Sequence, residues 1–168
     1  KRAVDAGVFT FMAAHNEING EPAHGSHYLL NDVLREEWGF KGFVVSDWMD
    51  IERLHTFHRV ATSQKEAVFQ TVHAGMDMHM HGPDFLEPLV ELVNEGRLSE
   101  ERIDASVGPM LLAKFRLGLF ENPYVDESLV AQSVFTAAHQ QTALDMASQA
   151  ILLLTNNASI LPLQKNTK

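Results

Sequence analysis

Three short apolar runs recur along the first half of the chain at a constant spacing. They cover residues 8–14, 42–46 and 76–80, so their starts are 34 residues apart. Each run has the length of a strand. Apolar residues at helical spacing fill the intervals between the runs. The order of strand, helix and strand at this spacing predicts βαβ units and a parallel sheet.

The helical patterns have recognisable beginnings and ends. Between the runs, we predict one helix that follows Ser26 and another that begins after Ser63 and stops at Gly75, because serine favours the N-cap and glycine the C-terminal stop. The pattern then becomes helical, over residues 83–94, 99–118 and 134–150, and the Gly108-Pro109 pair should kink or break the second of these. Residues 151–154 are expected to form a final strand.

Composition narrows the possible classes of protein. The chain has 168 residues, of which 45% are hydrophobic and 21% charged, and this is typical of a globular protein. A net charge of −9 argues against a nucleic-acid partner, and no apolar run reaches the roughly 18–20 residues of a membrane span. Cysteine is absent, which excludes thiolate chemistry. The first residue is not Met and both ends read as interrupted elements, so we expect a piece of a larger protein.

The carboxyl ends of the predicted strands are where the chemistry is expected. Ligands of parallel α/β folds bind there. Asp47 follows the second apolar run directly. An isolated charge at this place is costly to desolvate, so packing does not explain it, and a functional role is the favoured interpretation. The alternatives are a helix N-cap or an ion pair with Arg53. Trp48 is a candidate platform for the apolar face of a sugar, or simply an anchor of its loop.

Other polar residues allow different chemistry. Histidine occurs 9 times, and two of its pairs lie close in sequence. The pairs are His55 with His58 and His79 with His81. Together with Asp47 they offer the ligand atoms that a metal-dependent hydrolase uses. Nothing links their spacing to a known ligand pattern. Glu17 and Glu52 are each candidates to act with Asp47, since glycoside cleavage uses two carboxylates.

Two long motifs make a family resemblance visible. Residues 11–20 read FMAAHNEING, and residues 29–48 read LLNDVLREEWGFKGFVVSDW. These motifs, followed by residues 74–78, 115–124 and 151–163 in the same order, resemble glycoside hydrolase family 3, and most of all its bacterial β-glucosidase branch. The resemblance covers nearly the whole chain.

The resemblance implies a retaining β-glycosidase on a (β/α)8 barrel. It makes Asp47 the catalytic nucleophile and places Trp48 in the sugar site. His15 occupies a position near the nucleophile that is usually aromatic, and it is taken as substrate-binding. His79 and His81 stand where the family often has Glu and Pro. The family's general acid/base usually comes from its second domain, so Glu17 and Glu52 lose their catalytic role.

The fold class expected is α/β, as part of a TIM-barrel-like (β/α)8 domain with about three βα units plus C-terminal helices. Residues 1–125 are expected to be the C-terminal part of the barrel, 126–150 a linker and helix, and 151–168 the start of a second α/β domain. Three units cannot close a barrel, so the isolated chain should be inactive and poorly stable.

The expected partners are an oligosaccharide or β-glucoside substrate and the rest of the same polypeptide, without nucleic acid or membrane. No cofactor and no metal are expected, and the resemblance implies a periplasmic or extracellular location. Two alternatives stay open. One is a metal-dependent hydrolase that uses the histidines, and the other is a non-catalytic fragment that only binds carbohydrate.

Overall fold

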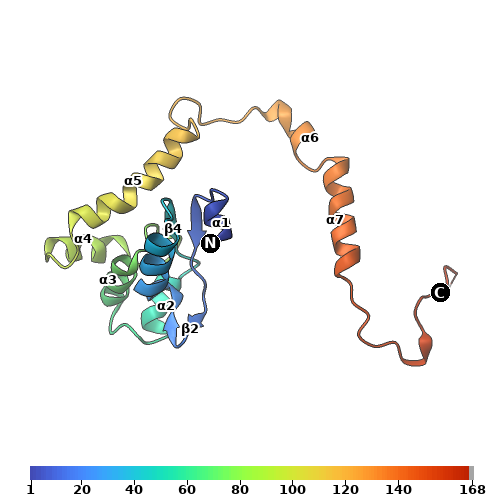
Figure 1. Ribbon diagram of the computed structural model, residues 1–168, viewed down its shortest axis with the longest axis horizontal. Coiled ribbons are helices and arrows are strands. Elements are labelled where there is room, and N and C mark those ends of the chain that lie inside the picture. Colours follow the sequence, from blue (N-terminus) through green and yellow to red (C-terminus); the bar gives the residue numbers. More distant parts are fainter. Residues whose placement is uncertain (167–168) are drawn as a thin grey trace. The chain divides into compact units, whose positions relative to one another are not determined.

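The chain is described over residues 1–166 in a computed structural model. It divides into two units, Lys1–Pro123 and a second that begins at Tyr124 (Figure 1). The first unit contains every buried side chain, and the described part of the second contains none. The core that positions a functional site therefore belongs to the first unit.

A small parallel sheet forms the centre of the first unit. Strands β1 (Thr10–Met12) and β4 (Phe43–Val45) are parallel and pair in register, with Phe11 opposite Val44. A separate antiparallel hairpin joins β2 (Glu17–Ile18) to β3 (Glu21–Pro22). The first two predicted strands are thus confirmed as parallel neighbours, as the βαβ pattern requires.

The third predicted strand, residues 76–80, is formed only in part. It contributes only one parallel bridge, between Val45 and Met78. The reason is local, because the carboxylate Oδ2 of Asp77 accepts a hydrogen bond from the Val44 backbone N at 2.8 Å. A side chain thereby takes the place of a ladder partner.

Helices surround the sheet and follow the predicted order. Ser63 and Ser99 cap their helices as predicted, since each hydroxyl accepts a hydrogen bond from the backbone N–H three residues later, at 3.2 and 3.3 Å. Gly75, with φ at +118°, ends its helix in the left-handed conformation that glycine permits. The helices of the first unit are α1 (Arg2–Asp5), the 3₁₀ turn η1 (Ala23–Gly25), the π-helix η2 (Tyr28–Glu37), α2 (Asp50–Thr56), α3 (Gln64–Ala74), α4 (Leu86–Asn94) and α5 (Glu100–Arg116).

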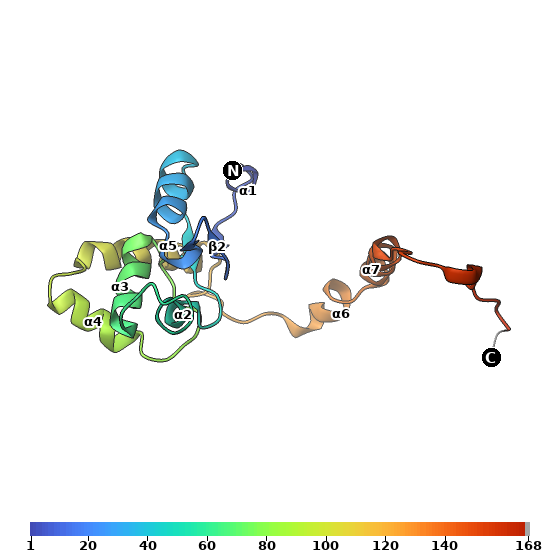
Figure 2. The same cartoon turned by 90° about the horizontal axis from the view of Figure 1, so that it is seen from below.

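Two apolar clusters hold these elements together. The helices α2, α3 and α4 pack side by side, and they bury Ile51, Val68 and Leu92 between them (Figures 1 and 2). The second cluster lies between the sheet and η2, where Val44 and Leu34 are both buried. The sheet is therefore fixed on one face by η2, and the turn after β4 leads directly into the α2 cluster.

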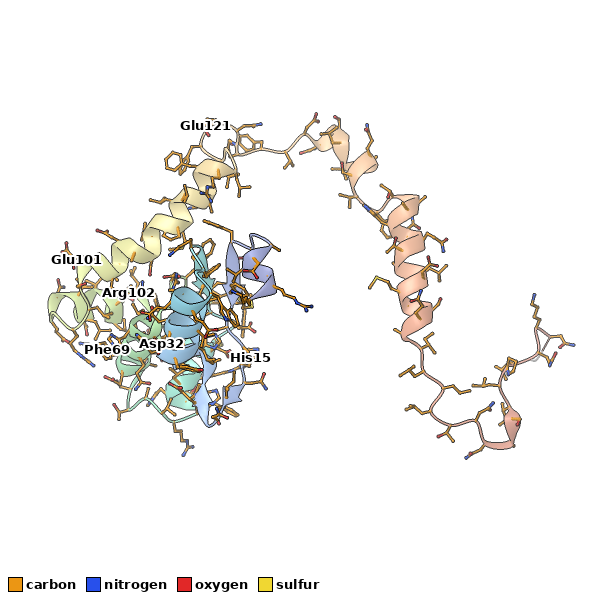
Figure 3. The ribbon with its side chains drawn as sticks, viewed as in Figure 1. His15, Asp32, Phe69, Glu101, Arg102 and Glu121 are labelled. Atoms are coloured by element: carbon orange, nitrogen blue, oxygen red, sulfur yellow. The ribbon has the colours of Figure 1, made fainter. Side chains whose placement is uncertain are left out.

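The proline of α5 does not break the helix. Residues 100–116 form one helix with Pro109 inside it, so of the predicted kink or break the break does not occur. A proline removes a single backbone hydrogen bond, and the first half of α5 is anchored independently of that bond. The anchor is Arg102 (Figure 3), which donates to the backbone oxygens of Val72 and Met76 at 2.9 and 2.8 Å.

The second unit has helices but no described strand. Residues 151–154, predicted as a strand, are exposed, form no regular secondary structure and pair with no described residue. A strand needs a neighbour for its backbone N–H and C=O groups, and none is present among the residues described. The helical elements are η3 (Glu127–Leu129), α6 (Val130–Ser133), α7 (Ala137–Ala150) and η4 (Asn157–Ser159). None of the described helices combines the length and the apolar character that crossing a membrane requires.

Asp77 is the residue whose loss should destabilise the first unit most sharply. Its side chain is only 1% exposed and pairs with Arg35 and Arg102. Asp77→Asn should lower the free energy of unfolding by about 3–5 kcal/mol, because both guanidinium groups lose their counter-charge in a buried site. Asp32→Asn, which removes a half-exposed pair with His27, is the control and should cost less than about 1 kcal/mol. Equal losses of melting temperature in the two variants would contradict this role.

Candidate active site

The parallel register of β1 and β4 brings their carboxyl ends together. Met12 lies opposite Val45, so the chain leaves both strands at the same edge of the sheet. His15 follows β1, and Asp47 follows β4. The two side chains meet, with His15 Nε2 3.0 Å from Asp47 Oδ2. The structure therefore brings together the two polar residues that the sequence placed at neighbouring strand ends.

Asp47 is held by its backbone surroundings but stays accessible. Its Oδ1 accepts a hydrogen bond from the backbone N of Trp48 at 2.6 Å, and its side chain is 28% exposed. The turn continues through Met49, which has a left-handed φ of +56°, before α2 begins. The carboxylate is thus fixed in direction, with one edge left open to solvent.

A second carboxylate, Asp50, lies behind this pair and was missed by the sequence analysis. Its side chain is 3% exposed. Oδ2 pairs with His15 Nδ1, and Oδ1 accepts from Arg53 Nη1 at 2.9 Å. His15 therefore lies between two carboxylates, with one ring nitrogen facing each of them.

The ion pair between Asp47 and Arg53, which the sequence left open, is not formed. Arg53 pairs with Asp50, three residues before it on α2. The spacing Asp47, Asp50 and Arg53, at intervals of three, places all three on one side of the turn and the first helical turns. That spacing is the signal that could have indicated the buried carboxylate.

His24, also missed, supports the turn from the interior. Its Nε2 accepts a hydrogen bond from the Asp47 backbone N at 3.0 Å, and its Nδ1 lies 3.1 Å from the Ala14 carbonyl oxygen. This pattern fits the neutral imidazole with its proton on Nδ1. Burial lowers the pKa of His24 below its usual value, while the nearby Asp50 carboxylate acts in the opposite direction.

The histidines expected as a metal donor set are dispersed over separate partners. His55 Nδ1 lies 3.0 Å from the Ala61 carbonyl oxygen, and His58 Nδ1 lies 2.7 Å from Glu17 Oε1. His79 faces the buried Glu52, with 3.3 Å between Nε2 and Oε1, and His81 stacks on Trp48. The pairs do not converge on Asp47.

One other group offers ligand atoms close together, namely His15, Asp47 and Asp50. The guanidinium of Arg53 stands beside it, with Nη1 3.2 Å from His15 Nδ1. A fixed positive charge at that distance opposes a bound cation. The arrangement therefore fits a hydrogen-bonded carboxylate network better than a metal centre.

Trp48 is exposed beside Asp47, as a sugar platform requires. Its side chain is 53% exposed, and one face is stacked on His81 at a centroid distance of 3.9 Å and an interplanar angle of 15°. A hollow of about 380 Å³ opens on the other side of His15, lined also by Arg53, Phe57 and His58. Asp47 thus lies next to an aromatic surface, and its partner His15 lines a hollow.

Comparison with known proteins gives consistent matches. The sequence model of the glycosyl hydrolase family 3 N terminal domain matches residues 1–111. A putative beta-xylosidase of Formosa agariphila is 43% identical over 162 residues, which is 96% of this chain and 21% of the relative. A lysosomal beta glucosidase of Dictyostelium discoideum is 41% identical over 165 residues, 96% of this chain and 20% of the relative. The chain thus spans about a fifth of the length of these relatives.

Solved structures agree with this match. A β-glucosidase from Erythrobacter marinus is 41% identical and superposes with a TM-score of 0.80, over 96% of this chain and 22% of that chain. A beta-glucosidase from Listeria innocua in complex with glucose is 35% identical, with a TM-score of 0.80 over 96% of this chain and 22% of that chain. The described fold is therefore a portion of an α/β, TIM-barrel-like architecture.

The neutral state of His24 predicts a loss of stability in acid. Because its pKa is lowered in the folded state, the unfolded chain binds the proton first as the pH falls through about 6.5. The melting temperature of this protein should therefore fall between about pH 7.5 and pH 5. In His24→Gln, whose amide can donate and accept at the same places, this part of the fall should shrink. An unchanged pH dependence in that variant would contradict the assignment.

Proposed function

Because the chain belongs to glycosyl hydrolase family 3, we propose that it carries Asp47 as the nucleophile of a retaining β-glycosidase. The observation that supports this most directly is the state of Asp47. It is a partly exposed carboxylate at a strand end, fixed by the Trp48 backbone N and by His15. The guanidinium of the nearby Arg53 pairs with Asp50 instead. A nucleophile needs such an oriented oxygen that is not bound by a fixed cation.

The reaction proposed has two steps at the same carbon. An Asp47 oxygen attacks the anomeric carbon, the glycosidic C–O bond breaks, and its electron pair stays on the leaving oxygen, which takes a proton from a general acid. Water then attacks the anomeric carbon, gives its proton to the conjugate base of that acid, and releases the Asp47 carboxylate. We assign the acid to a part of the polypeptide beyond this chain. No cofactor takes part in either step.

His15 is proposed as the residue that orients the nucleophile. Its two ring nitrogens face Asp47 and Asp50, so the buried carboxylate fixes the imidazole and the imidazole fixes the exposed carboxylate. His15 also lines the hollow beside the site, where it can contact a hydroxyl of the substrate. Trp48, on the opposite side, is proposed to cover an apolar face of the sugar.

The chain is proposed to work as the C-terminal part of a (β/α)8 barrel, residues 1–125, followed by a connecting helix over 126–150 and the start of a second α/β domain at 151–168. The sheet supports this assignment, since among the described residues β1 pairs only with β4 and leaves its other edge open. The rest of the polypeptide would continue the sheet at that edge. The substrate class proposed is a β-glucoside or oligosaccharide, in line with the glucose bound by the Listeria innocua relative.

Removal of the Asp47 carboxylate tests the function. In the full-length protein, Asp47→Ala should lower kcat by about 10³-fold or more, because no other group here can form the covalent intermediate. A 2-deoxy-2-fluoro glycoside should label a peptide that contains Asp47, as found by mass spectrometry. Label on Glu17 or Glu52 would contradict the assignment.

Replacement of His15 tests the orienting role separately. His15→Ala should lower kcat by up to about 10²-fold, because the carboxylate keeps its charge but loses a positioning contact. His15→Tyr should retain more activity, since a phenol can donate one hydrogen bond to Asp47. Steady-state kinetics on an aryl β-glycoside measures both variants. If Tyr and Ala lower kcat equally, a hydrogen bond at this position does not orient the nucleophile.

A further inference from the structure

The residues that follow the bridge between Val45 and Met78 are hydrogen-bonded to the turn that carries Asp47. We call residues 78–82 the clamp loop and residues 47–49 the nucleophile turn. Ser46 N donates to the Met78 carbonyl oxygen at 2.8 Å, and Met80 N donates to Ser46 Oγ at 2.9 Å. Met49 N, within the turn itself, donates to the His81 carbonyl oxygen at 3.1 Å. Each end of the nucleophile turn is therefore tied to the clamp loop.

A buried carboxylate faces a half-buried imidazole under this loop. Glu52, on α2, is 4% exposed, and its Oε1 is 3.3 Å from Nε2 of His79 in the clamp loop. Among the described residues, neither carboxylate oxygen has a hydrogen bond. An isolated buried carboxylate is costly, so its one facing imidazole is what compensates it.

The backbone of the clamp loop is shaped around this carboxylate. Gly82 has a φ of +152°, and a Cβ atom at this residue would lie 1.6 Å from Glu52 Oε1. On the other side, the His79 ring stacks on Phe85 at a centroid distance of 4.4 Å. Glu52 and His79 are thus packed into one orientation, and they fix the loop on both sides of His81.

The packing of the clamp loop fixes the position of His81 at the surface. His81 is exposed and lies flat against Trp48, 3.9 Å away with the planes 15° apart. A histidine on a free loop would lose side-chain entropy by holding such a position. The backbone of His81 is held by its hydrogen bond from Met49 N, so the stacked position costs less entropy. One face of Trp48 is covered, and the ring orientation is fixed relative to Asp47.

We propose that His81 and Trp48 form a composite platform for a sugar ring, and that Glu52 and His79 position it. This inference rests on the proposed function. The free face of Trp48 would pack against the apolar face of a pyranose, while His81, stacked on the other face of the indole, holds that ring in place. Glu52 and His79 do not touch the substrate and are positioning residues.

The platform predicts a split between binding and chemistry. In the full-length protein, His81→Ala should raise KM about 2- to 10-fold with kcat nearly unchanged, because the indole of Trp48 loses the ring that holds it in place against the sugar. His79→Gln should raise KM in the same direction. His73→Ala is the matched control, since His73 is another exposed histidine stacked on an aromatic ring, Phe69, and it should leave KM unchanged.

A double variant separates positioning from general destabilisation. If His79 acts through His81, adding His79→Gln to His81→Ala should raise KM no further. Glucose affinity, followed through the intrinsic tryptophan fluorescence, should weaken in the same order as KM rises. An unchanged or lower KM in His81→Ala overturns the platform, and additive increases in the double variant overturn the positioning role.

The two experiments distinguish a failure of the platform from a failure of the proposed function. If Asp47→Ala is inactive while His81→Ala keeps the KM of the unaltered protein, Asp47 remains the nucleophile and the platform is wrong. If Asp47→Ala stays active, the proposed function fails. Glucose affinity of His81→Ala then still decides the platform, because it does not depend on turnover.

Discussion

The buried carboxylate of Asp77 is the constraint on which the rest of the first unit depends. It accepts a hydrogen bond from the Val44 backbone N and from Ser106, and it pairs with Arg35 and Arg102. One side chain therefore joins the central strand β4 to η2 and to α5. Because it neutralises two guanidinium groups at once, it sets where β4 lies, and the position of β4 sets where Asp47 leaves the sheet.

From that point outward, the site is built by successive layers of support. His24 holds the backbone of Asp47 from the interior, and His15 holds its carboxylate from the end of β1. The clamp loop fixes both ends of the same turn. Met49 can keep its left-handed backbone conformation, because the surrounding hydrogen bonds determine the shape of the turn.

Local features of this fold could be predicted from the sequence, and tertiary ones could not. The apolar runs identified β1 and β4, and serine caps identified α3 and α5, since these depend on neighbours in sequence. The strand expected at residues 76–80 was reduced to one bridge because a side chain from Asp77 replaced a ladder bond. For the site, position alone indicated Asp47 and Trp48. His24 was missed because its role arises from burial beside distant residues, whereas the spacing of Asp50 from Asp47 and Arg53 was present in the sequence as a local signal.

The charges around Asp47 are arranged according to which groups are buried and which are exposed. Arg53 lies three residues after the buried Asp50 and six after the exposed Asp47, and it pairs with the buried one. A charge pair is stronger where water is excluded, so Asp50 is the better partner for the guanidinium. Asp47 is left with a backbone N–H and an imidazole, which orient a carboxylate without a permanent cation bound to it. The buried residue thereby keeps the exposed one available to a substrate.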